Sequence, residues 1–170
     1  MGYSTEFRGQ LSLSRNLTVE EKNYINTFSE TRRMKRDVNK LMEKHAGKYG
    51  NPFAIDESPE SIYGVEGEYF VLDDGDSGQI KCPDIINYNC PSMNQPGLWC
   101  QWKITDEDGV DVLEWDGGEK FYEYVSWLEY LIGHFFSKWG VLLNGEIEWR
   151  GEEWGDTGII HVENNVITIL

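Results

Sequence analysis

The sequence predicts an α+β fold: a mostly antiparallel sheet with two main helices on one face and a long irregular insertion. Segments that alternate apolar and polar residues follow one another with short turns between them, which is typical of antiparallel hairpins. Apolar residues at helical spacing occur in separate segments. The predicted order is strand, helix, insertion, two strands, helix and three strands, and this segregation of helices from hairpins favours the α+β class.

The first elements are indicated by an alternating run and a helix-start motif. Residues 5–13 alternate between apolar and polar types and predict a half-buried strand. Thr18 and Glu21 form a capping box, in which each side chain satisfies a free backbone amide at the start of a helix. We expect this helix to reach Met34 and a second one to begin near Asp37.

The segment 49–96 shows no sustained periodicity. It is rich in Pro, Gly, Asn and Asp, which predicts an irregular insertion with one short strand at residues 68–72. A loop of this length is unusual in a compact domain, and such loops are often functional.

A hairpin is predicted after the insertion. Its first strand places four residues on one face: Leu98, Cys100, Trp102 and Ile104. The acidic, glycine-containing segment 106–109 supplies the turn, and residues 110–115 form the second strand.

The longest helix and the last strands follow this hairpin. Asp116 is a candidate N-cap, an apolar stripe over residues 121–139 has helical spacing, and Gly140 stands where a left-handed C-cap is expected. Asn164 and Asn165 suit a tight turn with positive φ. The remaining strands are predicted at 141–150, 157–162 and 166–170.

Composition narrows the function classes. The chain has 170 residues and a net charge of −15, and aromatic residues make up 14 %, which fits a single folded domain over residues 1–170 and not a disordered chain. No apolar run is long enough to span a membrane. The acidic excess disfavours direct nucleic-acid binding. Three cysteines and a start without a signal-peptide pattern favour a cytoplasmic setting.

The charge is unevenly distributed along the sequence. Residues 1–50 hold ten Lys+Arg and six Asp+Glu, whereas residues 51–170 hold five and 24. The corresponding net charges are +4 and −19. A mildly basic third therefore precedes an acidic body that contains all seven tryptophans, and we expect the two to pack in one domain.

Several motifs together resemble a family of uncharacterised small proteins of phages and bacteria. They are the segments QPGLWCQW at 95–102, EWDGGEKFY at 114–122, ETRRMKRD at 30–37 and LNGEIEW at 143–149. The resemblance covers most of the chain outside residues 45–90. It implies one domain with a variable insertion and a phage or bacterial cytosolic setting, and it transfers no catalytic residue.

The first candidate site is a cluster of four cations within residues 32–36. If this segment is helical, Arg32, Lys35 and Arg36 share a face, and Trp99 is a candidate stacking surface. Arginine forks bind phosphate, so the cluster predicts a site for a small anion or a nucleotide. The alternative is structural: the cations complement a helix C-terminus and pair with the acidic body.

The second candidate site is an acidic turn that contains a tryptophan. Trp154 is flanked by Glu152, Glu153 and Asp156 in a segment where an aromatic side chain is hard to bury. Exposed tryptophan with an acidic rim is typical of an interface anchor for a basic protein surface. We add the adjacent Glu146 and Glu148 to this predicted partner site. The alternative is a loop tryptophan folded back over the sheet edge.

Catalytic motifs are weak. Glu146 and Glu148 share a strand face, but a glycosidase needs two carboxylates on either side of a sugar, and alternating surface glutamates are common. A cysteine–histidine pair that combines Cys90 or Cys100 with His134 or His161 has no local activating feature. The acidic loop at 73–78 lacks a ligand that a calcium loop requires, and the cysteine spacing does not suit zinc. We therefore expect neither a metal nor a cofactor.

The sequence favours a non-enzymatic acidic binding protein. The leading hypothesis is a phage-type inhibitor that occludes a basic surface of a host defence or nucleic-acid-processing protein. An immunity or antitoxin protein would act by the same physics. The alternative is a protein that binds a small anionic ligand or a nucleotide, with or without an enzymatic activity.

Overall fold

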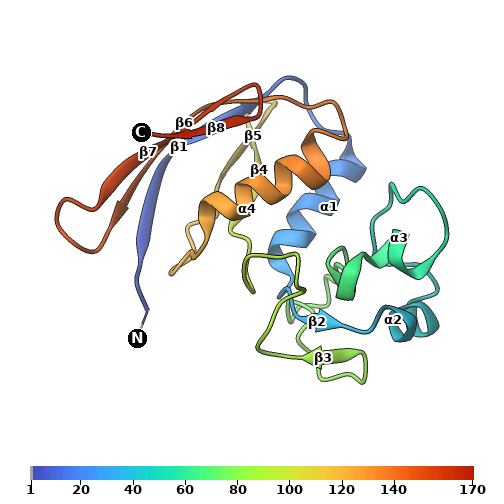
Figure 1. Ribbon diagram of the computed structural model, residues 1–170. Helices are drawn as coiled ribbons and strands as arrows, with labels where there is room; N and C mark the ends of the chain where they lie inside the picture. Colours follow the sequence, from blue (N-terminus) through green and yellow to red (C-terminus); the bar gives the residue numbers. More distant parts are fainter. Residues whose placement is uncertain (1) are drawn as a thin grey trace. The chain divides into compact units, whose positions relative to one another are not determined.

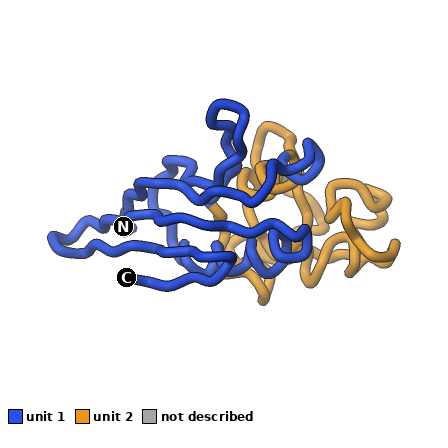
Figure 2. Tube along the Cα trace, turned by 90° about the horizontal axis from the view of Figure 1, so that it is seen from above, with its two compact units in different colours: residues 1–22, 101–170 blue, residues 23–100 orange. Residues whose placement is uncertain are grey.

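The computed structural model describes residues 2–170, which form two compact units. Unit 1 combines the chain up to Lys22 with Gln101–Leu170, and unit 2 holds Asn23–Cys100 (Figure 2). Unit 2 is inserted between two parts of unit 1 along the chain. The expectation that residues 1–170 fold as a single domain stays a prediction.

Unit 1 is built on a six-stranded sheet in which every neighbouring pair is antiparallel (Figure 1). The first strand of the chain lies inside the sheet, between β5 and β6. In spatial order the strands are β4 (Trp102–Glu107), β5 (Val110–Trp115), β1 (Thr5–Leu13), β6 (Leu143–Gly151), β7 (Thr157–Glu163) and β8 (Val166–Ile169).

The inner face of this sheet carries an aromatic core. Phe7 of β1 meets the rings of Trp102, Phe121 and Tyr124 at centroid distances of 4.9–5.7 Å, all in edge-on geometry. Helix α4 (Tyr124–Leu131) continues into a π-helical turn, η2 (Ile132–Phe136), and covers this face (Figure 1). The opposite face carries the polar residues of the strand alternation.

Unit 2 consists of short elements around a smaller core. Helix α1 (Val19–Glu30) begins in unit 1 and ends in unit 2, and Asp37 caps α2 (Val38–His45) through the Asn39 and Lys40 amides. The core contains Leu41, Tyr63 and Phe70, all fully buried. The other elements are β2 (Lys35–Arg36), α3 (Pro59–Tyr63), η1 (Val65–Gly67) and β3 (Ile85–Asn87).

The α+β class and the mostly antiparallel sheet are confirmed. The strand at 5–13, the 106–109 turn and the start of α2 after Asp37 also lie where the sequence places them. Asn164 and Asn165 both take positive φ in the turn between β7 and β8.

Four local predictions are wrong. The first helix ends at Glu30 and not at Met34, because the amides of Arg32 and Arg33 donate instead to the carbonyls of Ser77 and Leu98. Residues 68–72 form no strand, and the strand expected from Leu98 begins at Trp102. The long helix begins at Tyr124, since the Asp116 carboxylate caps a tight turn through the Gly118 amide at 2.7 Å.

Candidate binding surface at the β6–β7 hairpin

The turn between β6 and β7 is held in a defined conformation. The Gly151 amide donates to the Asp156 carbonyl at 2.8 Å, and the Asp156 amide donates to the Glu153 carbonyl at 3.1 Å. Gly155 takes a φ of 84°, in the left-handed region that glycine tolerates best. Local backbone hydrogen bonds thus define the conformation of this turn without contacts from other parts of the chain.

The N-terminal segment adds a second layer of support to this turn. The Tyr3 hydroxyl donates to the Asp156 carboxylate and accepts from the Glu153 amide at 3.2 Å. Its hydrogen bond to Asp156 raises the pKa of Tyr3. The Ser4 amide donates to Glu152 Oε1 at 2.7 Å. Asp156 and Glu152 therefore shape the turn.

Trp154 lies at the tip of this supported turn and is 96 % exposed. The prediction that it is an exposed tryptophan among carboxylates agrees with this geometry, and the alternative in which it folds over the sheet edge does not. Glu152 and Glu153 are also exposed, whereas Asp156 is half-buried. The predicted partner-binding role of these four residues stays a prediction.

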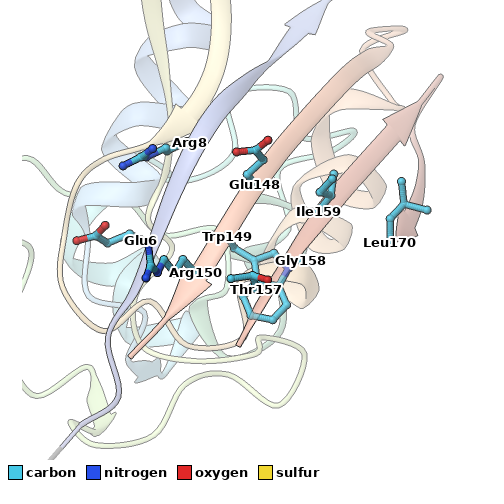
Figure 3. A pocket seen from close by; sticks show the side chains of 9 residues that line it. All are labelled: Glu6, Arg8, Glu148, Trp149, Arg150, Thr157, Gly158, Ile159 and Leu170. Atoms are coloured by element: carbon cyan, nitrogen blue, oxygen red, sulfur yellow. The ribbon is translucent and has the colours of Figure 1, made fainter. Parts of the chain in front are cut away.

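A hollow of about 510 Å³ opens on the outer sheet face near the base of the same hairpin (Figure 3). Its lining includes charged residues of β1 (Glu6 and Arg8) and of β6 (Glu148 and Arg150). Ile159 of β7 and Leu170 contribute apolar side chains. Its two glutamates and two arginines balance in charge. The hollow therefore adds no acidic excess to the surface.

The structure places Glu146 and Glu148 on this same outer face, with different neighbours. Glu146 pairs with His161 Nδ1 of β7 at 3.1 Å, and Glu148 lies opposite Arg8 of β1 and Ile159 of β7 in the strand register. Glu146 is therefore engaged in a contact with an imidazole, and Glu148 has an arginine opposite it in the neighbouring strand. Glu153 lies in the turn, outside the strand register, and is exposed.

The cation cluster at 32–36 is extended and not helical, so the predicted shared face is wrong. The Arg36 guanidinium is buried and pairs with Asp84 at 2.7 Å. Lys35 pairs with Glu66 at 3.3 Å. These two side chains thus serve internal contacts, and the anion-binding role assigned to them stays a prediction.

Arg32 and Trp99 are brought together as the sequence suggests. The Arg32 guanidinium carbon lies 5.8 Å from the Trp99 ring centroid and 4.2 Å from that of Tyr88. Both distances are within the range of cation–π attraction. The adjacent Arg33 is not part of the predicted site; it is buried and donates to the carbonyls of Glu68 and Phe70.

No protein-family model, curated protein or solved structure matches this chain. The resemblance to the family of small phage and bacterial proteins therefore stays a prediction. None of the helices formed by residues 2–170 combines the length and apolar character that crossing a bilayer requires. Among the same residues, no three His, Cys, Asp or Glu side chains are grouped to hold a metal ion.

Proposed function

We propose that this protein is a non-enzymatic binding protein whose β6–β7 hairpin tip docks onto a basic surface of a partner protein. The partner class that fits is a host or phage protein with a basic surface, such as a host defence protein or a nucleic-acid-processing protein. The observation that supports the proposal is the exposure of Trp154 on a turn fixed by hydrogen bonds.

A large contribution to binding is available from this one side chain. Aromatic side chains bury about 150–250 Å² each, which sets an upper limit of roughly 4–6 kcal/mol of transfer free energy at about 25 cal/mol per Å², and only part of it appears as affinity. Because the turn is already ordered by Tyr3 and Ser4, less conformational entropy is lost on docking. This combination of exposure and rigidity is typical of an interface hot spot.

Charge selects the kind of surface that the tip meets. Unit 1, which carries the hairpin, holds 18 Asp+Glu and 7 Lys+Arg. Such a field accelerates encounter with a basic surface and disfavours acidic ones. Glu153 at the tip contributes a local carboxylate next to the Trp154 anchor.

The test is affinity capture from an extract of the source cells, followed by identification and purification of the captured protein. Binding of that protein is then measured by calorimetry for the wild type, for Trp154→Ala and for Glu153→Gln. We expect Trp154→Ala to weaken binding by at least about 30-fold, the equivalent of a hot-spot loss of about 2 kcal/mol. Glu153→Gln should reduce the dependence of the affinity on salt.

The matched control removes charge from the β4–β5 turn instead. Asp108 lies in another acidic turn of unit 1, and Asp108→Asn removes one negative charge, as Glu153→Gln does. It should leave the affinity close to that of the wild type. The proposal fails if Trp154→Ala binds as tightly as the wild type.

One observation favours the alternative of a small anionic ligand. Arg32 is half-exposed and lies beside two aromatic rings, Tyr88 and Trp99, on which a base could stack. A panel of nucleotides tests this alternative: a ligand that binds the folded state raises the melting temperature. Loss of such a shift in Arg32→Gln would assign the site, and no shift with the wild type would exclude it.

A further inference from the structure

The last strand of the unit 1 sheet leaves one side of its backbone open. β8 is the outermost strand, and no strand formed by residues 2–170 pairs with its far side (Figure 2). The Leu170 amide donates to the Ile159 carbonyl of β7 at 2.9 Å, and the Leu170 carbonyl accepts from the Ile159 amide at 3.2 Å. Bonded and non-bonded pairs alternate along an antiparallel ladder, so the residues one and three positions before Leu170 direct their backbone groups outward. These residues are Ile167 and Ile169, and they offer two amide donors and two carbonyl acceptors.

The side chains along this edge are uncharged and largely exposed. β8 contains no charged residue and no proline, and Val166 and Ile169 are 66 % and 50 % exposed. The opposite edge of the sheet differs, because β4 carries three charged residues, Lys103, Asp106 and Glu107. Natural sheets protect free edges with charges, prolines or bulges, since an unprotected edge pairs with another chain. β8 is therefore the edge of this sheet that is open to pairing.

Exposed carboxylates flank both ends of the β8 edge. At one end, Glu163 of β7 lies opposite Val166 in the strand register. At the other end, Leu170 lies opposite Ile159, two residues after the start of β7, and the hairpin turn with Glu153 lies beyond that start. A segment laid along β8 therefore passes an apolar stretch in the middle and an acidic group at each end.

We propose that the β8 edge accepts an extended segment of a partner protein, apolar at its centre and basic at both ends. The segment adds a strand to the sheet, and its backbone bonds to the outward groups of Ile167 and Ile169. Its alternate apolar side chains pack beside those of the same two isoleucines. Its basic ends meet Glu163 and Glu153. The inference rests on the proposed function, because it assigns the segment to the basic partner that Trp154 anchors.

A second copy of this chain fits the edge less well. A two-fold axis would pair β8 with itself in antiparallel direction, so the Val166 end of each strand would meet the Leu170 end of the other. Glu163 of one copy would then face the end at which Glu153 of the other copy lies. Each copy of unit 1 also has a net charge of −11. Like charges oppose this pairing, whereas a segment with basic ends is attracted.

The first experiment uses the intact chain and a synthetic peptide of sequence KKVTVTVKK with both ends blocked. Nuclear magnetic resonance measures its binding and the hydrogen exchange of the β8 amides. We expect saturating peptide to slow exchange at the Ile167 and Ile169 amides by about tenfold or more, because these amides gain a partner. The peptide EEVTVTVEE reverses the end charges, and KKVTPTVKK lacks the central backbone donor. Each should bind about tenfold more weakly.

Two substitutions at one position then separate backbone from side chain. Ile169→Pro removes an outward amide and leaves the ladder to β7 intact, whereas Ile169→Ala removes the side chain and keeps the amide. We expect Ile169→Pro to bind KKVTVTVKK about tenfold more weakly than Ile169→Ala does. Slow exchange of the Leu170 amide verifies in both variants that β8 stays paired with β7.

A charge reversal tests the acidic ends without altering the backbone. Glu163→Lys should weaken binding of KKVTVTVKK and strengthen binding of EEVTVTVEE, because it reverses the charge at one end of the edge. Asp108→Lys, in the exposed turn between β4 and β5, is the matched control and should change neither affinity by a comparable factor.

Several results would overturn the inference. It fails if KKVTVTVKK leaves exchange at Ile167 and Ile169 unchanged, if the three peptides bind alike, or if Glu163→Lys acts no differently from Asp108→Lys. A wild-type dimer in sedimentation that Ile169→Pro dissociates would make a second copy the occupant. With the purified partner, the two proposals fail separately. Equal binding by Trp154→Ala and the wild type contradicts the proposed function, whereas equal binding by Ile169→Pro and Ile169→Ala contradicts pairing at β8.

Discussion

The buried ion pair of Arg36 and Asp84 permits a quantitative test of how unit 2 is held together. The two side chains are only 3 % and 2 % exposed. Arg36 also donates to the Gly78 carbonyl at 2.5 Å and stacks on the Phe70 ring at 4.5 Å. The substitution Arg36→Met keeps much of the aliphatic packing and removes the charge and both donors.

The expected cost follows from what the substitution leaves behind. Asp84 then carries a buried charge without its guanidinium partner, and breaking such a pair costs about 3–5 kcal/mol. Domains are stable by about 5–15 kcal/mol in total, so the loss is a large share. The double variant Arg36→Met/Asp84→Leu removes both charges, and we expect it to recover much of the loss because apolar pairs can replace buried ion pairs.

Urea unfolding followed by circular dichroism measures these free energies. If Arg36→Met costs less than about 1 kcal/mol, the charge is solvated or compensated in a way that contradicts the burial. If the double variant is as unstable as the single one, packing and not charge is the dominant contribution of Arg36. Either result would refute the reasoning.

The remaining predictions concern the core, the sheet, acid stability and cooperativity. Leu41→Ala should cost about 2–5 kcal/mol in urea unfolding, because Leu41 is fully buried in the unit 2 core. Gly145→Ala should destabilise the protein by more than about 1 kcal/mol, because the φ of Gly145 is 139° and an added Cβ would lie 2.8 Å from the Gln10 carbonyl oxygen. Gly109→Ala should cost less, because a Cβ added at Gly109 has no atom within 4 Å. Burial alone raises the pKa of Asp84, but the hydrogen bonds that Cys82 and Arg36 donate to its carboxylate outweigh this effect and lower the pKa. The stability that this shift contributes is therefore present above the unfolded pKa of about 3.9 and is lost as the pH falls through the folded pKa. Unfolding free energies measured across this pH range should show the loss. If residues 1–170 are one domain, tryptophan fluorescence, which reports mainly on unit 1, should change at the same urea concentration as circular dichroism.

The sheet of unit 1 is largely predictable from the sequence because its signals are local. Alternation at 5–13 and the turn chemistry at 106–109 and 164–165 specify hairpins from neighbouring residues alone. The end of the first helix is different. The chain leaves the helix after Glu30 because the amides of Arg32, Arg33 and Lys35 donate to distant carbonyls, those of Ser77, Leu98 and Cys90, which no local pattern indicates.

The candidate sites also differ in whether local sequence or long-range contacts define them. Trp154 is recognisable because a tryptophan among Glu and Gly in a turn has few ways to be buried, and exposure is the result. By contrast, the contact between the Lys44 ammonium and the Cys82 sulfur could not be recognised from the sequence, because the two residues are 38 positions apart and neither belongs to a spacing motif. For the arginines, charge density is visible in the sequence, but their burial depends on carboxylate and carbonyl partners from the 66–90 segment.

The fate of those cations changes what the net charge means for function. Unit 2 holds 8 Lys+Arg and 12 Asp+Glu, a net charge of −4, while the net charge of unit 1 is −11. Most of the basic cluster is turned inward: Arg33 and Arg36 are buried, and Lys35 is paired with Glu66. Lys35 and Arg36 each pair with a carboxylate, and such pairs contribute little to the field at a distance, whereas the exposed carboxylates of unit 1 remain. A partner that approaches unit 1 in solution therefore meets an acidic surface. The exposed Trp154 lies within the negative field of this surface. Electrostatic attraction of a basic protein and anchoring by Trp154 therefore belong to the same proposal.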